Sequence, residues 1–435
     1  MSASPAPVVA PRPAAARVRL QAVDRRDAAL MSVGTLASGV LAYAFNVLAA
    51  RSLGPESYGA IGALWAGMFL LAVLLFRPLE QTISRAVSHQ LAHGVDARPV
   101  VRSAARLAVG VTVAATAGCL ALWGPITNGL FGGRAALTVA LIVGLAGYAA
   151  SYFARGVAGG VRWFGGYGLV LLADGAIRVL VALPLIFIAS PTVAAVAIAA
   201  AAGAGALAPL CSRGRDALRR LGGAEGEGYS VRAAGRFALP AAVIAGCEQI
   251  LISGGPLIVL ISGGEGAAAA AGVLFAATLL VRAPVFLFQG VQASLLPNLT
   301  TFEAQGDQAR LRRATALTAG AIAGLAVILA AGALAVGPWT MGLLFGDGFD
   351  ATRADLALLA LGVGGFLAAC TFCQALLARG QGAVAAVRWC AAALLFIVLA
   401  LTLGGSEFHR VSIAFAASGG LVALLLVSAV WRQRT

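Results

Sequence analysis

The chain has 435 residues, of which 60% are hydrophobic and only 11% are charged. This composition excludes a water-soluble globular protein, because an ordinary core cannot bury so much apolar surface, and it indicates an integral membrane protein. The net charge is +14, and all 31 basic residues are Arg. Because these arginines are spread among the apolar segments, the charge does not indicate a nucleic-acid-binding domain, and nucleic acid is not an expected partner.

The first residues of the chain are rich in Pro, Ala and Arg and contain no apolar core. Their composition predicts a disordered cytoplasmic N-terminal tail at residues 1–27. A cleavable signal peptide would need an apolar core, so this segment does not fit one.

Twelve segments are apolar over about 20 residues, the length that crosses a bilayer as a helix. Six of them lie in residues 28–211 and six in residues 237–435, and the polar segment 212–236 separates the two sets. The sequence therefore predicts an all-α polytopic membrane protein with about 12 transmembrane helices, arranged as an N-terminal six-helix bundle, a cytoplasmic linker and a C-terminal six-helix bundle. The predicted spans are 28–51, 58–76, 103–123, 134–154, 167–189, 191–211, 237–262, 267–296, 314–337, 354–378, 382–403 and 410–431.

The distribution of Arg predicts the orientation of the spans. If the N-terminus is cytoplasmic, 25 of the 31 arginines fall in inner segments or at inner helix ends, and two lie within spans. This asymmetry follows the positive-inside rule, so we expect a multi-pass protein of the inner (plasma) membrane with cytoplasmic N- and C-termini. The four arginines of the outer segments are Arg51, Arg134, Arg353 and Arg410.

A weak internal repeat relates the two sets of spans. The segment that begins at Asn46 can be aligned with the segment that begins at Gly255, so that Gly54 matches Gly263. Transporters often contain two related halves around a central site.

The segment RSLGPESYGAIG, residues 51–62, interrupts the apolar sequence between the first two spans. Gly54 is conformationally permissive and Pro55 cannot continue a helix, so the first helix is predicted to end there. Glu56 suits the start of the next helix, where a carboxylate meets exposed amides. Tyr58 is expected at the level of the lipid headgroups. These residues predict a helix–turn–helix at the outer face.

The pattern LGPESYG, with Gly54, Pro55, Tyr58 and Gly59, resembles the LGPxxYG segment of the bacterial polysaccharide (O-antigen or capsule repeat-unit) flippases. That family belongs to the multidrug/oligosaccharidyl-lipid/polysaccharide exporter superfamily. The arrangement of twelve spans in two sets of six also resembles that family. The matching segment of the second half, SGGEGAAAAAG, lacks the Pro and the Tyr of the motif. The resemblance implies two six-helix bundles around a central cavity.

The resemblance also implies a function. The expected protein is a transporter and not an enzyme, and it flips a polyprenyl-pyrophosphate-linked oligosaccharide to the outer leaflet for polysaccharide biosynthesis. The expected partners are that glycolipid, the lipid bilayer, and a polysaccharide polymerase or glycosyltransferases. No cofactor is expected, and a proton or sodium gradient is the expected driving force. Two alternatives stay open, a multidrug or cation antiporter of the same superfamily and a lipid II-type flippase.

Four charged residues lie in the interior of spans, away from the span ends, where an ionisable side chain is costly and indicates a functional role. Arg178 and Arg282 are candidates for cavity residues that hold a pyrophosphate, because a guanidinium suits bidentate phosphate contacts. Asp174 and Glu248 are candidates for ion coupling. The alternative is two structural ion pairs, one of Asp174 with Arg178 and one of Glu248 with Arg282. The sequence does not decide between these roles for the two arginines, and it favours structural pairs over ion coupling for the two carboxylates.

Uncharged polar residues within the spans either line a sugar path or hydrogen-bond neighbouring helices. Gln249 and Gln289 are the substrate-binding candidates among them. Glu80, at the inner end of the second span, is expected on a solvated interfacial helix, and the alternative is a place near the cavity entrance. No metal site is expected, because His89 and His93 have no nearby carboxylate or Cys partners in the sequence.

Overall fold

The computed structural model describes residues 25–224, 231–264, 266–282 and 307–432, and nearly all of them are helical. These residues contain no β-strand, and an isolated bridge joins Val95 to Ala224. The helices are α1 (Arg25–Ala92), α2 (Arg98–Ala121), α3 (Ala135–Gly160), α4 (Phe164–Ala182), α5 (Pro191–Ala202), α6 (Ser212–Arg219), α7 (Val231–Ser262), α8 (Ala267–Val281), α10 (Gln308–Phe345), α11 (Arg353–Ala378), α12 (Gly382–Thr402) and α13 (Glu407–Arg432). Three short turns of 3-10 or π-helix are η1 (Pro125–Leu130), η2 (Leu183–Ile186) and η3 (Gly203–Leu210).

Nine helices of the described part of the chain are long and apolar enough to cross a membrane. α1 counts once among them although it covers the first two predicted spans. Two shorter apolar helices, Pro191–Leu207 and Ala267–Val281, coincide with two more predicted spans. Every predicted span therefore matches helical residues as far as the structure describes them, and the expected all-α polytopic fold is confirmed.

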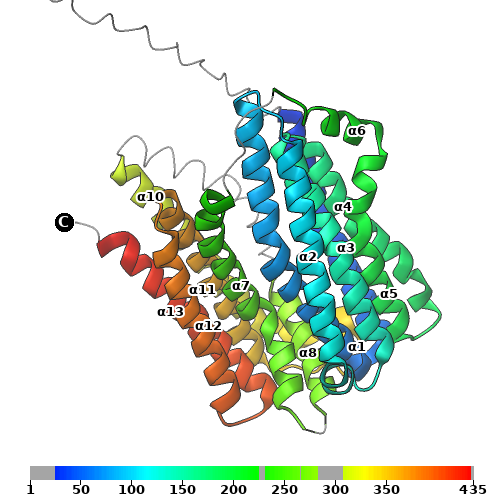
Figure 1. Ribbon diagram of the computed structural model, residues 1–435. Coiled ribbons are helices and arrows are strands. Elements are labelled where there is room, and N and C mark those ends of the chain that lie inside the picture. Colours follow the sequence, from blue (N-terminus) through cyan, green and yellow to red (C-terminus); the bar gives the residue numbers. More distant parts are fainter. Residues whose placement is uncertain (1–24, 225–230, 265, 283–306, 433–435) are drawn as a thin grey trace, which may run out of the picture.

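α1 is a hairpin of two helical arms, residues 25–53 and 55–92. Gly54 between them has φ 69° and ψ 170°, a non-helical conformation. The hydroxyl of Tyr58 lies 3.1 Å from Oδ1 of Asn46, whereas two residues this far apart in a straight helix would be separated by about 18 Å. Figure 1 shows the two arms, in dark and lighter blue, running between the lower and upper ends of the molecule, the dark blue arm partly hidden behind other helices. The chain thus reverses direction at the predicted break.

Several helices extend beyond the ends of their predicted spans, and α1 and α10 do so by the most residues. The second arm of α1 continues to Ala92, past the predicted end at residue 76, and α10 continues to Phe345, past the predicted end at residue 337. Apolar sequence marks the depth of the hydrocarbon, whereas backbone hydrogen bonds continue a helix into the headgroup region. The span prediction therefore underestimated the helix lengths.

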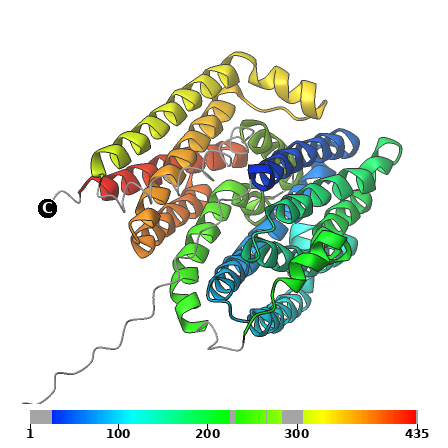
Figure 2. The same cartoon turned by 90° about the horizontal axis from the view of Figure 1, so that it is seen from above.

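The helices form two groups that are joined by α7 and α8. In the first group α1 packs against α3 and α4, and α3 packs against α5. In the second group α11 packs against α10 and α13, and α12 packs against α13 and α7. α1 also packs against α7 and α8, so these two helices connect the groups (Figure 2).

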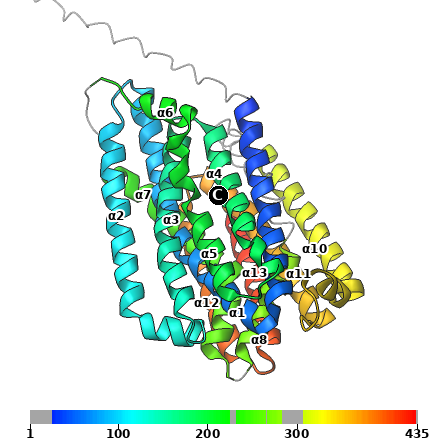
Figure 3. The same cartoon turned by 90° about the vertical axis from the view of Figure 1, so that its right-hand side faces the viewer.

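The two ends of the helices define two sides of the molecule. The beginning of α1 and the helix α6 lie at the upper end in Figures 1 and 3, which we call the α6 side. The reversal of α1 lies at the opposite end, which we call the Gly54 side. The distribution of Arg predicts that the α6 side is cytoplasmic.

Candidate functional site

Arg178 on α4 is enclosed by an ion pair and an aromatic ring. Its Nη2 atom lies 2.5 Å from Oδ2 of Asp174, one helical turn earlier, and 3.1 Å from the hydroxyl of Tyr148 on α3. The guanidinium covers the ring of Trp65, with 4.7 Å between Cζ and the ring centroid. The side chain of Arg178 is 1% exposed. The Nε atom of Arg178 is buried and has no hydrogen-bond partner among the described residues. Because the carboxylate, the hydroxyl and the ring enclose the rest of the guanidinium, this geometry favours a structural ion pair over a cavity-facing role.

Glu248 and Arg282 do not form the second predicted pair. Glu248 on α7 lies 4.0 Å from Nη1 of Arg77 on α1, so this contact bridges the two helix groups. Arg282 follows the last residue of α8 and donates from Nη1 to the carbonyl of Ile252 at 3.3 Å. No carboxylate of the described residues lies within ion-pair distance of Arg282. The two candidate residues therefore belong to separate sites.

The uncharged candidate Gln249 has a local partner. It donates from Nε2 to the hydroxyl of Ser253, one turn later on α7, at 2.9 Å. Asn46, another polar residue within a span, is fully buried and donates to the carbonyl of Ala42 at 2.8 Å. Gln289 lies outside the described residues.

The turn at Gly54 belongs to the contact between the helix groups. Tyr58 is fully buried, and its ring centroid lies 5.5 Å from that of Phe275 on α8 and 5.7 Å from that of Phe349. The ring of Tyr58 therefore faces neighbouring helices and not the lipid headgroups, whereas its expected depth in the membrane stays a prediction. The side chain is buried because its ring packs on aromatic neighbours and its hydroxyl bonds Asn46 instead of water.

Two glycines let α1 and α8 approach each other backbone to backbone. A Cβ atom on Gly59 would lie 1.9 Å from the carbonyl oxygen of Ala268, and one on Gly272 would lie 2.0 Å from that of Pro55. Nearby, the guanidinium of Arg51 donates to two carbonyl groups near the end of α10. The residues of the LGPxxYG-like segment thus hold the helix groups together on the Gly54 side.

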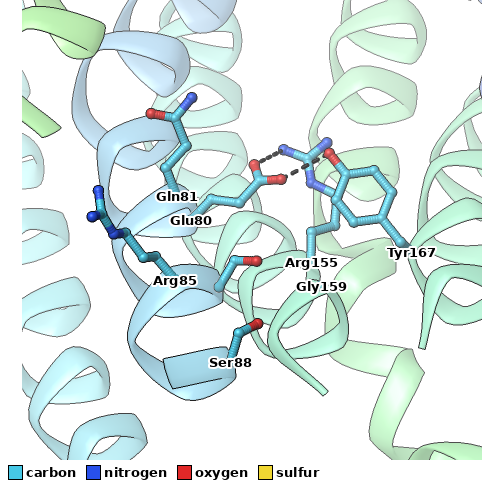
Figure 4. Close-up of a pocket in the computed structure, with 8 residues that line it drawn as sticks. Glu80, Gln81, Arg85, Ser88, Arg155, Gly159 and Tyr167 are labelled. Carbon is cyan, nitrogen blue, oxygen red and sulfur yellow. Dashed lines mark hydrogen bonds and ion pairs between the residues drawn. The ribbon is translucent and has the colours of Figure 1, made fainter. Parts of the chain in front are cut away.

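A pocket of about 350 Å³, lined mostly by residues with polar groups, lies on the α6 side, between the second arm of α1, α3 and α4 (Figure 4). Within it, the carboxylate of Glu80 accepts a hydrogen bond from Nη2 of Arg155 at 3.1 Å and one from the hydroxyl of Tyr167 at 2.7 Å. We call this the α6-side pocket. Its lining residues are Glu80, Gln81, Ser84, Arg85, Ser88, Arg155, Gly159 and Tyr167.

This pocket corrects the expectation for Glu80. The side chains of Glu80 and Arg155 are only 13% and 11% exposed, so the carboxylate lies between helices and not on a solvated surface. Arg155 is one of the 25 inner arginines that predict the orientation of the spans, and neither Arg155 nor Tyr167 was a candidate site residue. A signal was present, because Arg155 follows a span at the same membrane face as Glu80, and a half-buried carboxylate requires a cationic partner.

No protein-family model matches the chain. Two relatives of similar sequence are uncharacterized proteins of mycobacteria. One from Mycobacterium tuberculosis (strain H37Rv) is 29% identical over 347 residues, which cover 75% of this chain and 74% of the relative. One from Mycobacterium bovis is 28% identical over 356 residues, which cover 78% of this chain and 77% of the relative.

Solved transporters share the fold. An inward-facing and an outward-facing conformation of a multidrug resistance MATE family transporter of the MOP superfamily both match with a TM-score of 0.66. Their sequence identities are 14% and 15%, and the matches cover 91% and 94% of this chain and 96% of each solved chain. A MOP superfamily transporter from Pyrococcus furiosus matches with a TM-score of 0.66 and 14% identity, over 93% of this chain and 95% of that chain.

These comparisons define the class of protein by its fold. The chain is a multi-pass, all-α membrane protein with the fold of MOP-superfamily transporters. The superfamily expected from the LGPxxYG-like segment therefore agrees with the structural neighbours.

Proposed function

We propose that the protein is a membrane transporter that flips a polyprenyl-pyrophosphate-linked oligosaccharide from the α6 side to the Gly54 side. The proposal rests on the numbers of carboxylates and arginines that lie between the helices. The carboxylates of Glu80, Asp174 and Glu248 each lie beside an arginine. Arg282, by contrast, has no carboxylate partner in the described part of the chain. Because a buried charge requires compensation, the excess positive charge favours an anionic cargo such as a pyrophosphate.

The contacts between the helix groups support loading from the α6 side. On the Gly54 side, Tyr58 is fully buried and Gly59 packs against the backbone of α8. Nearer the α6 side, Arg77 lies between the groups beside Glu248, yet its side chain is 44% exposed. A transporter in this conformation is closed on the Gly54 side and accessible from the α6 side.

A multidrug or cation antiporter is the second candidate, because multidrug transporters share the fold. The rings of Trp65, Phe69 and Tyr148 form a cluster beside Asp174 that resembles a surface for organic cations. Arg178 pairs with that carboxylate and covers the ring of Trp65, which makes this cluster a poor cation site. The Pyrococcus furiosus transporter is described as having a binding pocket of reverse polarity that suggests a different function. This description supports the idea that proteins of this fold differ in the charge of their cargo.

Deletion of the gene, followed by lipid extraction, tests the cargo. If the protein is a transporter of the proposed kind, its deletion causes a polyprenyl-linked oligosaccharide to accumulate in the inner leaflet. Accumulation of lipid II instead would identify the lipid II-type alternative. Unchanged glycolipids together with new sensitivity to cationic dyes would identify the antiporter and contradict the proposal.

The same deletion strain tests Arg282 by complementation. Arg282→Ala is expected to slow flipping about tenfold to a hundredfold, because it removes a charge-assisted contact to phosphate. Arg219→Ala is the control, since that side chain is 82% exposed on α6 and should leave flipping unchanged. Arg178 is unsuitable for this test, because its removal leaves Asp174 without its ion-pair partner. Wild-type flipping by an inserted, monodisperse Arg282→Ala protein would exclude Arg282 from the cargo path.

A further inference from the structure

We infer that Pro256 on α7 is a positioning residue for Arg282. The carbonyl group that this proline leaves free, that of Ile252, anchors the guanidinium of Arg282 in place. The anchor is a feature of the protein alone and is independent of what it transports. Its consequence for an anionic cargo rests on the proposed function, which assigns Arg282 to the pyrophosphate.

Pro256 interrupts the backbone hydrogen bonds of α7. It lies inside this helix, and proline has no N–H group. In a regular helix the N–H of residue 256 would donate to the carbonyl four residues earlier, which is that of Ile252. This carbonyl is therefore left without its helical partner. Because the hydrocarbon core contains no water, another group of the protein has to supply the missing donor.

Arg282 supplies this donor. Its Nη1 atom lies 3.3 Å from the carbonyl oxygen of Ile252 and donates to it. The acceptor is thus the carbonyl that Pro256 frees, and not an arbitrary group of α7. α8 lies alongside this part of α7, since a Cβ atom on Gly255 would lie 3.3 Å from Cδ2 of Leu274. The proline and the arginine consequently form one interaction between α7 and α8.

The anchor holds the guanidinium without cancelling its charge. A carbonyl group is neutral, whereas Arg178 is held by the carboxylate of Asp174. Within the described helices, no carboxylate lies within ion-pair distance of Arg282. A guanidinium has several N–H donors, and the bond to Ile252 uses one of them. Arg282 is therefore a fixed cation whose terminal nitrogens have further N–H groups for a phosphate oxygen.

The anchor lies near the middle of the membrane and at the boundary between the helix groups. Ile252 is about ten residues before Ser262, where α7 ends on the Gly54 side, so it lies about 15 Å into a hydrocarbon core of about 30 Å. Tyr43, on the first arm of α1, donates its hydroxyl to the carbonyl of Leu279 at 2.8 Å. The first helix group therefore also contacts the end of α8, just before Arg282. Transport sites commonly lie at this depth between two halves.

Binding of a short polyprenyl pyrophosphate to the full-length protein in nanodiscs tests the positioning role. Pro256→Ala returns an N–H to the carbonyl of Ile252, which then no longer needs Arg282, and the apparent affinity is expected to fall about tenfold. Arg282→Ala should cost at least as much. The double variant should bind no more weakly than Arg282→Ala, because both changes break the same interaction. Pro240→Ala, at the other proline within α7, is the matched control and should bind like the wild type.

An ester at position 256 separates the missing N–H from the shape of the proline ring. The α-hydroxy analogue of alanine, incorporated by nonsense suppression, also lacks the N–H and leaves the carbonyl of Ile252 free. This variant is expected to bind the probe like the wild type, whereas Pro256→Ala does not. If the ring acted only on the shape of the helix, both replacements would weaken binding equally, and this result would overturn the inference.

Thermal unfolding without cargo tests the anchor by itself. Arg282→Ala leaves the carbonyl of Ile252 without a donor, so its loss of midpoint should be smaller when Pro256→Ala is also present. An equal loss in both backgrounds would contradict the anchor. A smaller loss, together with no affinity of the wild type for pyrophosphate, would support the anchor and contradict the proposed cargo.

Discussion

Gly54 shows how one residue sets the direction of a long apolar chain. Its φ of 69° and ψ of 170° lie in a region that is essentially restricted to glycine. A Cβ atom at this position would meet no other atom within 4 Å, so the requirement comes from the backbone and not from packing. The reversal it creates brings the hydroxyl of Tyr58 to Asn46 and starts the contact with α8.

At this scale we predict that Gly54→Ala lowers the stability of the folded protein by about 1–3 kcal/mol, the cost of holding an L-residue in such a conformation. Thermal unfolding of the purified protein measures the effect as a lower midpoint. Gly110→Ala on α2 is the matched control. It also has no neighbour within 4 Å, but it lies in regular helix, where Ala is favoured over Gly. A midpoint that changes equally in both variants would contradict the backbone argument.

At the scale of helices, the crossing of α1 and α8 is the contact that begins at this turn. Small residues at Gly59 and Gly272 let the two helix backbones touch, which is typical of close helix contacts in membranes. The rings of Tyr58 and Phe275 pack beside this contact. Because α1 belongs to the first helix group and α8 joins it to the second, the crossing determines how closely the groups meet on the Gly54 side.

Gly59→Ala is expected to force α1 away from α8, because its Cβ atom would lie 1.9 Å from the carbonyl oxygen of Ala268. Overpacking of this kind costs about 1–3 kcal/mol, and the unfolding midpoint should fall accordingly. Gly67→Ala tests the specificity of the effect on the same arm. Its nearest neighbour would be a methyl group of Leu257 at 4.0 Å, so its stability should be close to that of the wild type. Equal loss in both variants would argue against the backbone contact.

For the whole molecule, the two helix groups are closed on the Gly54 side and are bridged nearer the α6 side by Arg77 and Glu248. Inward-facing and outward-facing conformations of one solved transporter match this fold with the same TM-score. The fold therefore does not identify the conformation, and the contacts between the groups do. The proposed transport across the membrane would require that the Gly54-side contact opens.

A disulfide across this contact should stop transport. A Cβ atom on Gly62 would lie 3.1 Å from Cβ of Phe275, close to the range of about 3.5–4.5 Å that a disulfide requires. In a background without the six native cysteines, oxidised Gly62→Cys/Phe275→Cys protein is expected to lose transport and to recover it on reduction. The single variants are the controls. Undiminished transport by fully cross-linked protein would show that this contact does not open.

The number of spans and the break at Gly54 could be predicted from the sequence because both are local properties. A bilayer selects apolar runs of about 20 residues wherever they occur, and Gly54 followed by Pro55 breaks a helix without help from distant residues. The pairing of Asp174 with Arg178 is also local, since the two residues are one turn apart on α4. None of these features depends on which helices become neighbours.

Only the tertiary structure decided which distant residues meet. Glu248 lies beside Arg77 and not Arg282, and Glu80 meets Arg155 from another helix. Tyr58 is buried against α8 instead of facing lipid headgroups. Each of these outcomes depends on the order and rotation of packed helices, which apolar runs do not encode, because every helix face that avoids water is equally acceptable to lipid.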